Sequence, residues 1–219
     1  MREILGKRRK SSPELLRAAL TCAERWQWPV VPGAGTDARG GCACLRPDCP
    51  VPGAHPHDPG LLAATRDPRM VRWWWTRRPD QPLVLATGDR VSAVSLPAVA
   101  GARALGVFDK LGVRTGPVVA TPTRFAVLVE PYSLAELGEL LDRHEWVPTS
   151  LRYHGEGGYL VLPPSPVGSD GSDGTAARWV RRPVVDPGDR APWLPSVRVI
   201  VDTLVQAGRT APDGSRLSY

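Results

Sequence analysis

The segment GCACLRPDCPVPGAHPH, at residues 41–57, restricts the local structure of this chain more than any other stretch. It contains three of the four cysteines and two of the four histidines of the sequence, spaced C-x-C-x4-C-x5-H. Its glycines and prolines exclude a helix or a central strand, so we expect an irregular loop. Because such a loop has little order of its own, its cysteines and histidines predict that a bound metal orders it.

Zinc is the metal that this set of donors favours, because Cys3His is a common structural zinc site. We predict Cys42, Cys44 and Cys49 as ligands, with His55 or His57 as the fourth. The alternatives are a disulfide and free loop thiols. A Cys42–Cys44 pair is too close for an easy disulfide, and a bridge to Cys49 would leave one thiol unpaired. A closed set of four ligands leaves no position for water, so the predicted role is structural.

Alternating helical and strand patterns predict an α+β (mixed α/β) class, with a mixed sheet flanked by helices and the zinc loop as an insertion. We expect a basic disordered tail over 1–11, one domain over 12–208 with a flexible loop at 165–175, and a disordered tail over 209–219. The first helix is expected to have Ser12 as its N-cap and to end before Trp28. Further helices are expected at 68–76, 98–112, 133–146 and 195–208. Strands are expected at 28–32, 82–87, 91–98, 116–121, 124–131 and 177–185, with a hairpin at 150–165.

The net charge of +6, which comes almost entirely from arginine, permits a nucleic-acid partner without demonstrating one. No run of 18 apolar residues occurs and no secretory signal opens the sequence, so we expect no membrane association and a cytoplasmic location.

The motif RWWWTRR at residues 72–78 combines stacking surfaces with guanidinium groups, as single-stranded nucleic-acid sites do. Adjacent helical residues point about 100° apart, so one or two of these tryptophans are expected in the core. Arg72, Arg77 and Arg78 are candidate nucleic-acid contacts. Cys22, on the apolar face of the first predicted helix, is expected to be a core residue.

Several segments, in order, together resemble the N-terminal domain of bifunctional DNA primase-polymerases, in the archaeo-eukaryotic primase superfamily. They are WQWPVVP, CACLRPDCPVPGAHP, AATRDPRMVRWWWTRRP, LVLATG and HGEGGYLVLPPS, and the resemblance covers about residues 13–185. Within it, His55 lies in the PGAHP that matches the family's loop, so the resemblance favours His55 as the fourth ligand and keeps His57 in reserve.

The resemblance implies catalysis with two divalent cations held by a D-x-D motif, a histidine on a later strand and an aspartate before the Gly-Gly-Tyr motif. The D-x-D positions here hold Ser95 and Pro97. Phe125 or Ala126 stands where the histidine falls, and Arg152 stands near the third position. Hard divalent cations prefer anionic oxygen ligands, so we expect neither magnesium nor manganese, and no catalytic residues.

The leading hypothesis is a primase-polymerase-like domain that has lost its metal-dependent carboxylates and acts as a nucleic-acid- or nucleotide-binding accessory or regulatory protein. Candidate contacts besides the three arginines above are Arg124, Arg152 and His154. Its partner would be DNA, RNA or a replication or regulatory protein. One alternative is an active primase-polymerase with unusual ligands, drawn from Asp89, Glu130 or Glu156. The other is a structural protein-interaction module that binds no nucleic acid.

Overall fold

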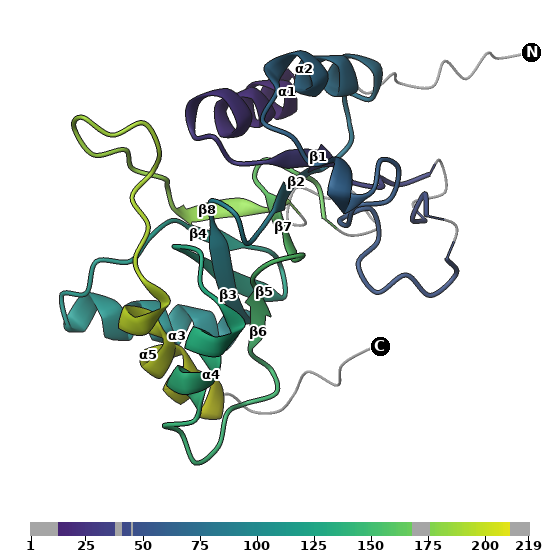
Figure 1. Cartoon of the computed structure of the whole chain (residues 1–219). Coiled ribbons are helices and arrows are strands. Elements are labelled where there is room, and N and C mark those ends of the chain that lie inside the picture. The colour runs from purple at the N-terminus through teal and green to yellow at the C-terminus, as the bar shows by residue number, and fades with distance from the viewer. Residues whose placement is uncertain (1–12, 38–40, 45, 168–175, 211–219) are drawn as a thin grey trace, which may run out of the picture.

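Two antiparallel sheets and five α-helices organise the computed structural model, which describes residues 13–37, 41–44, 46–167 and 176–210 (Figure 1). The α-helices are α1 (Pro13–Leu20), α2 (Pro68–Arg77), α3 (Ala98–Lys110), α4 (Leu134–Leu141) and α5 (Val197–Arg209). A π-helical turn η1 (Thr21–Arg25) continues α1, and a short 3-10 helix η2 (Leu61–Ala63) precedes α2. The strands are β1 (Val30–Pro32), β2 (Leu83–Ala86), β3 (Ser92–Pro97), β4 (Val118–Ala120), β5 (Arg124–Val129), β6 (Arg152–His154), β7 (Tyr159–Leu162) and β8 (Arg178–Arg181).

The smaller sheet has the strand order β1-β2-β7 and packs with α1 and α2. Its central strand β2 is fully buried at Leu83, Val84 and Leu85, as a strand covered on both faces must be. Trp28 and Trp75 are the largest fully buried side chains of this core. The apolar faces of α1 and α2 therefore pack into one common hydrophobic cluster.

The larger sheet has the order β6-β3-β5-β4-β8, and α3, α4 and α5 gather on one side of it (Figure 1). The second core cluster joins Val94 and Leu96 of β3 to Phe108 of α3 and Ile200 of α5. Side chains alternate across a strand, so Ser95 points to the opposite face, toward the smaller sheet. That face of the larger sheet forms the site described below.

The α+β class is confirmed, whereas the expectation of one mixed sheet is wrong. All strand pairs among the described residues are antiparallel, and they form two separate sheets. The chain returns from α3 into β4, but β4 does not pair with β3. Instead the tight β4–β5 hairpin inserts β5 between them, antiparallel to both.

The predicted hairpin over residues 150–165 is also wrong, although its turn exists. The N–H of Gly158 donates to the carbonyl of Gly155 at 3.1 Å, and Gly157 has a φ of +72°. However, β6 pairs with β3 of the larger sheet and β7 pairs with β2 of the smaller one. The turn packs against Thr87, whose hydroxyl donates to the Gly155 carbonyl at 2.7 Å, so the two arms diverge into different sheets. This segment therefore links the two sheets.

Helix termini follow the sequence signals in part. Asp67 caps α2 and Ser133 caps α4, each by accepting a hydrogen bond from a backbone N–H two or three residues later. The carboxylate of Glu136, in the first turn of α4, pairs with Arg198 of α5 at 2.7 Å. The helix α4 ends at Leu141, short of its expected end at residue 146. Within the described ranges no helix is long and apolar enough to cross a membrane.

The expected boundaries fall partly outside the described residues. The tail at 1–11, the Ser12 cap, residues 168–175 and residues 211–219 all lie outside them. Ser165, at the start of the expected flexible loop, is fully buried and accepts a hydrogen bond from the N–H of Leu83 at 2.7 Å. It therefore belongs to the packed structure.

Candidate metal loop and basic cleft

Four donor atoms of the cysteine-rich loop converge on one point. The side chains of Cys42, Cys44, Cys49 and His55 each offer one donor atom, and all four atoms lie within 4.8 Å of one another. The Nε2 atom of His55 is 3.2 Å from the Cys42 sulfur and 3.4 Å from the Cys49 sulfur. His57 is not part of this group, and its ring centroid is 6.4 Å from that of His55. The four residues are close enough to bind a metal ion.

Neighbouring groups prepare two of these donors for a cation. The Nδ1 atom of His55 is 2.9 Å from the Pro56 carbonyl, so Nδ1 donates there and the Nε2 lone pair stays free for a metal. Burial raises the pKa of the Cys42 thiol, but hydrogen bonds from the backbone of Gly53 and Cys44 and from neighbouring side chains outweigh it and bring the pKa to about 6. The thiolate is the form that binds metal.

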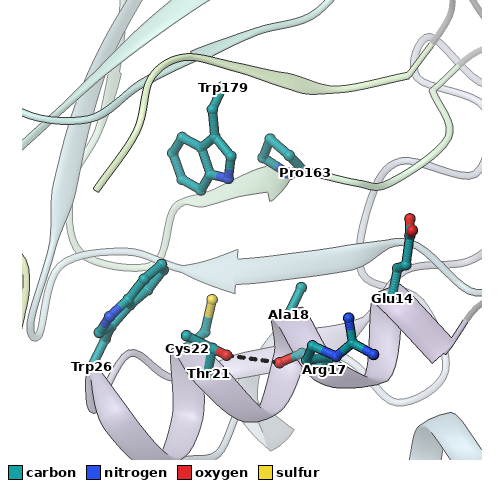
Figure 2. A pocket seen from close by; sticks show the side chains of 8 residues that line it. All are labelled: Glu14, Arg17, Ala18, Thr21, Cys22, Trp26, Pro163 and Trp179. Atoms are coloured by element: carbon teal, nitrogen blue, oxygen red, sulfur yellow. Dashed lines mark hydrogen bonds between the residues drawn. The ribbon is translucent and has the colours of Figure 1, made fainter. Parts of the chain in front are cut away.

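Cys22 takes no part in the loop, and its expected core position is confirmed at 2% exposure. It lines a separate cavity of about 250 Å³ between the helical residues of α1 and η1 on one side and Pro163, after β7, and Trp179 of β8 on the other (Figure 2). Burial raises the pKa of its thiol far above the usual range, so the thiol is unreactive at neutral pH.

A larger cavity, of about 660 Å³, lies between the metal loop, the linking turn and the inner face of the larger sheet. We call it the cleft. Its apolar wall includes Pro50, Val51 and Pro52 of the metal loop, and Gly157 and Gly158 of the turn form another part. The polar side chains that line it include those of Ser95, Arg124, Arg152 and His154. Among the described residues lining the cleft there is no aspartate or glutamate.

Three of the positions singled out in the sequence lie side by side on neighbouring strands. In the strand register, Ser95 of β3 is paired with Ala126 of β5 on one side and with Arg152 of β6 on the other. Phe125 is paired with Leu96 and packs against the second core cluster, on the helix side of the sheet. Pro97 is the last residue of β3 and does not line the cleft. The row Arg152–Ser95–Ala126 therefore crosses the cleft face of the sheet.

A hydrogen-bonded chain runs through this row. The Nε of Arg124 donates to the Ser95 hydroxyl at 3.2 Å, and its Nη2 donates to the carbonyls of Ser95 and Ser150, both at 2.8 Å. The Ser95 oxygen is 2.9 Å from Nε2 of His154, whose Nδ1 is 3.0 Å from the Tyr159 carbonyl. Since a carbonyl can only accept, Nδ1 carries the proton and Ser95 donates to Nε2.

Burial and the two arginine charges set the charge states of the groups in the cleft. Burial lowers the pKa of His154 to about 4, and the charges of Arg124 and Arg152 act in the same direction, so the imidazole is neutral at pH 7. Burial and, secondarily, Arg152 lower the pKa of Arg124 to about 10, which leaves the guanidinium charged. Neither arginine forms an ion pair with any acidic residue in the described part of the chain. Two uncompensated positive charges therefore face the cleft.

The remaining predicted nucleic-acid contacts lie on α2, apart from the cleft lining. Arg72 and Arg77 are exposed, and the Arg77 guanidinium lies 4.7 Å from the ring of Trp73, which is 50% exposed. Trp74 and Trp75 are buried, which confirms that part of the tryptophan run belongs to the core. Arg78 differs from the other two, because it pairs with Asp58 at 3.3 Å.

The fold and the cleft by themselves do not name a family, and a comparison with known families does so. The sequence model of the bifunctional DNA primase/polymerase N-terminal domain matches residues 19–194. The chain belongs to this family. Neither a curated protein nor a solved structure matches the chain.

Sequence reasoning did not anticipate two features of the site. Arg124 was expected to contact a ligand, but its three bonds to Ser95 and Ser150 depend on strand register, which a single sequence does not reveal. Its position two residues before Ala126 was the available signal, since residues i and i+2 share a face of a strand. The second feature is the position of residues 50–52 in the cleft wall, which no sequence pattern indicated.

Proposed function

We propose that this protein is a primase-polymerase-family domain that binds a nucleic acid or nucleotide in its cleft and does not extend a primer. The observation that carries the proposal is the row Arg152–Ser95–Ala126, to which the guanidinium of Arg124 is bound. The family's catalysis needs two divalent cations, which neutralise the triphosphate and activate the primer hydroxyl. A hydroxyl, a methyl group and two guanidinium groups do not fit such cations, because magnesium and manganese require anionic oxygen ligands.

The alternative of an active enzyme with unusual ligands finds little support in the cleft. Asp89, Glu130 and Glu156 are the carboxylates that would have to replace the missing ones, and none of them lines it. Asp89 faces Arg66 at 3.8 Å and Arg90 at 3.7 Å instead. We further propose a role as an accessory or regulatory pseudoenzyme in the cytoplasm, with a replication or regulatory protein as a further partner.

Zinc in the Cys42, Cys44, Cys49 and His55 set completes the proposal. The donors are soft or borderline, four in number and closed around one point, as in structural zinc sites. Such an ion holds the loop whose residues Pro50, Val51 and Pro52 form one wall of the cleft. The metal then shapes the binding surface and takes no part in chemistry.

A salt titration tests the binding half of the proposal. Fluorescence anisotropy with a short labelled single strand should show binding at low salt. The affinity should fall as salt rises, with a slope of log K against log [salt] of about −1.4 or steeper if Arg124 and Arg152 each neutralise one phosphate. Absence of binding at low salt to DNA, RNA and nucleotides would favour the structural module instead.

A further inference from the structure

The cleft carries positive side chains at the place where members of the family have the carboxylates that bind their catalytic cations. Arg124 and Arg152 face it without a carboxylate partner among the described residues, and neutral His154 adds no charge. The charge of Arg152 opposes protonation of Arg124, so the two guanidinium groups repel each other in the free protein. A bound anion between them would remove that repulsion.

From this arrangement we infer that the cleft binds the phosphate of a nucleotide directly on Arg124 and Arg152, without any divalent cation. The inference rests on the proposed function and makes it more specific. In a two-metal site, cations bridge the protein carboxylates to the phosphate oxygens. Here the guanidinium groups carry the positive charge themselves and donate directed N–H bonds to phosphate oxygens.

The hydrogen bonds around Arg124 prepare it for this task. Its Nε and Nη2 atoms are held by Ser95 and Ser150, and these bonds fix the plane of the guanidinium group. No hydrogen bond from Nη1 occurs among the described residues, so this atom has donors left for a ligand. Ser95 is itself oriented by His154, whose Nδ1 is held by the Tyr159 carbonyl. Such a fixed donor loses little conformational entropy on binding.

The opposite wall suits the rest of a nucleotide. Pro50, Val51 and Pro52 from the metal loop offer an apolar surface at the same cavity. Gly158 also lines the cleft, and an added Cβ there would come within 2.7 Å of the Thr87 hydroxyl, so the backbone there is closely packed. A charged end and an apolar side fit a nucleoside phosphate better than a bare inorganic anion.

The experiment measures binding of two probes, ATP and a short 5′-phosphorylated oligonucleotide, by calorimetry. Each is tested with an excess of magnesium and in buffer freed of divalent cations on a chelating resin. The metal content of the protein is measured before and after the resin treatment, so that a loss of binding caused by loss of the loop metal is not taken for a requirement for magnesium. We expect at least one probe to bind with the same affinity in both buffers. Binding that requires magnesium would overturn the inference but leave the binding half of the proposed function intact.

Matched variants identify the residues responsible. Arg152→Gln and Arg124→Gln should each weaken binding roughly 10–100-fold, as loss of a charged hydrogen-bond donor does. The side chain of Arg152 is exposed and makes no hydrogen bond or ion pair among the described residues, so its variant is expected to fold even if Arg124→Gln does not. Arg143→Gln removes the same charge from an exposed site outside the cleft and should change affinity little. Equal losses in Arg152→Gln and Arg143→Gln, or none in Arg152→Gln, would overturn the assignment. Metal-dependent primer extension is a separate outcome, which contradicts the proposed function itself.

Discussion

Replacement of one loop ligand, Cys49→Ser, should release the metal and disorder the cysteine-rich loop while both hydrophobic cores remain folded. The reason is that the loop has few contacts of its own. Four backbone hydrogen bonds connect it to the segment after β1: Ala34 to His55 at 2.8 Å, Gly35 to Gly53 at 3.0 Å, Asp37 to Gly41 at 2.8 Å, and Ala43 to Gly35 at 3.1 Å. The loop is therefore expected to depend on the ion for its order.

The magnitudes agree with that dependence. At roughly 1 kcal/mol each, the four hydrogen bonds contribute about 4 kcal/mol. Ordering the described part of residues 41–57 costs on the order of 16 kcal/mol, at roughly 1 kcal/mol per residue. The difference, about 12 kcal/mol, lies within the roughly 10–16 kcal/mol that structural zinc contributes in small zinc-binding peptides.

Metal analysis and hydrogen exchange together form the assay. The wild-type protein should contain about one zinc per chain, the stoichiometry of one closed site, and the N–H groups of Ala34, Gly35 and Ala43 should be protected. In Cys49→Ser the metal should be lost and these amides should exchange nearly as fast as free ones. Amides of the buried strand β2 should keep their protection.

Cys22→Ser is the matched control, because it removes a thiol that is 2% exposed and outside the ligand set. It should lower the free energy of unfolding by about 1–3 kcal/mol through burial of a hydroxyl, yet retain the metal and the loop protection. The reasoning is refuted if Cys49→Ser keeps the metal, or if it loses the metal with no change in exchange at Ala34, Gly35 and Ala43.

Three further substitutions test the packing and the charge state of the larger sheet. Gly101→Ala should lower the free energy of unfolding by about 1–3 kcal/mol in a denaturant titration, because the new Cβ would lie 2.4 Å from the Cβ of Phe125. Gly106→Ala, at a helical position with nothing within 4 Å, should instead raise it by about 0.5–1 kcal/mol, and a loss there would contradict the packing argument. The folded-state pKa of His154, about 4, lies below the ordinary 6.5, so the unfolded state binds more protons and stability should fall as pH decreases from about 6.5 to 4. That loss should amount to about 2–4 kcal/mol and be absent in His154→Gln; equal pH profiles for the two proteins would show that the imidazole is not buried in neutral form.

Local signals in the sequence predicted most elements of the fold. The starts of α2 and α4, the buried β2 strand and the β4–β5 turn all depend on neighbouring residues, and each was predicted near its observed place. The divergence of β6 and β7 was missed, because turn glycines specify a reversal of the chain but not the partner of each strand. That choice depends on the contact of Thr87 with the turn, about 70 residues away.

The candidate site shows the same division. The four loop donors lie within 17 residues of sequence, so their spacing alone indicated a common point. The row Arg152–Ser95–Ala126 joins three strands that are distant in sequence, and only the register makes these residues neighbours. The resemblance placed each residue at a family position, but the bonds from Arg124 to Ser95 and Ser150 needed the structure.

A primer-extension assay on the zinc-loaded protein tests the central claim most directly. Protein of measured zinc content is given a primed template and all four deoxynucleotides, with magnesium or manganese, and binding of the same template is measured in parallel. We predict that the template binds and that the primer does not lengthen with either cation, since no carboxylate among the described residues lines the cleft. Incorporation that depends on magnesium or manganese and is lost on their removal would contradict the claim.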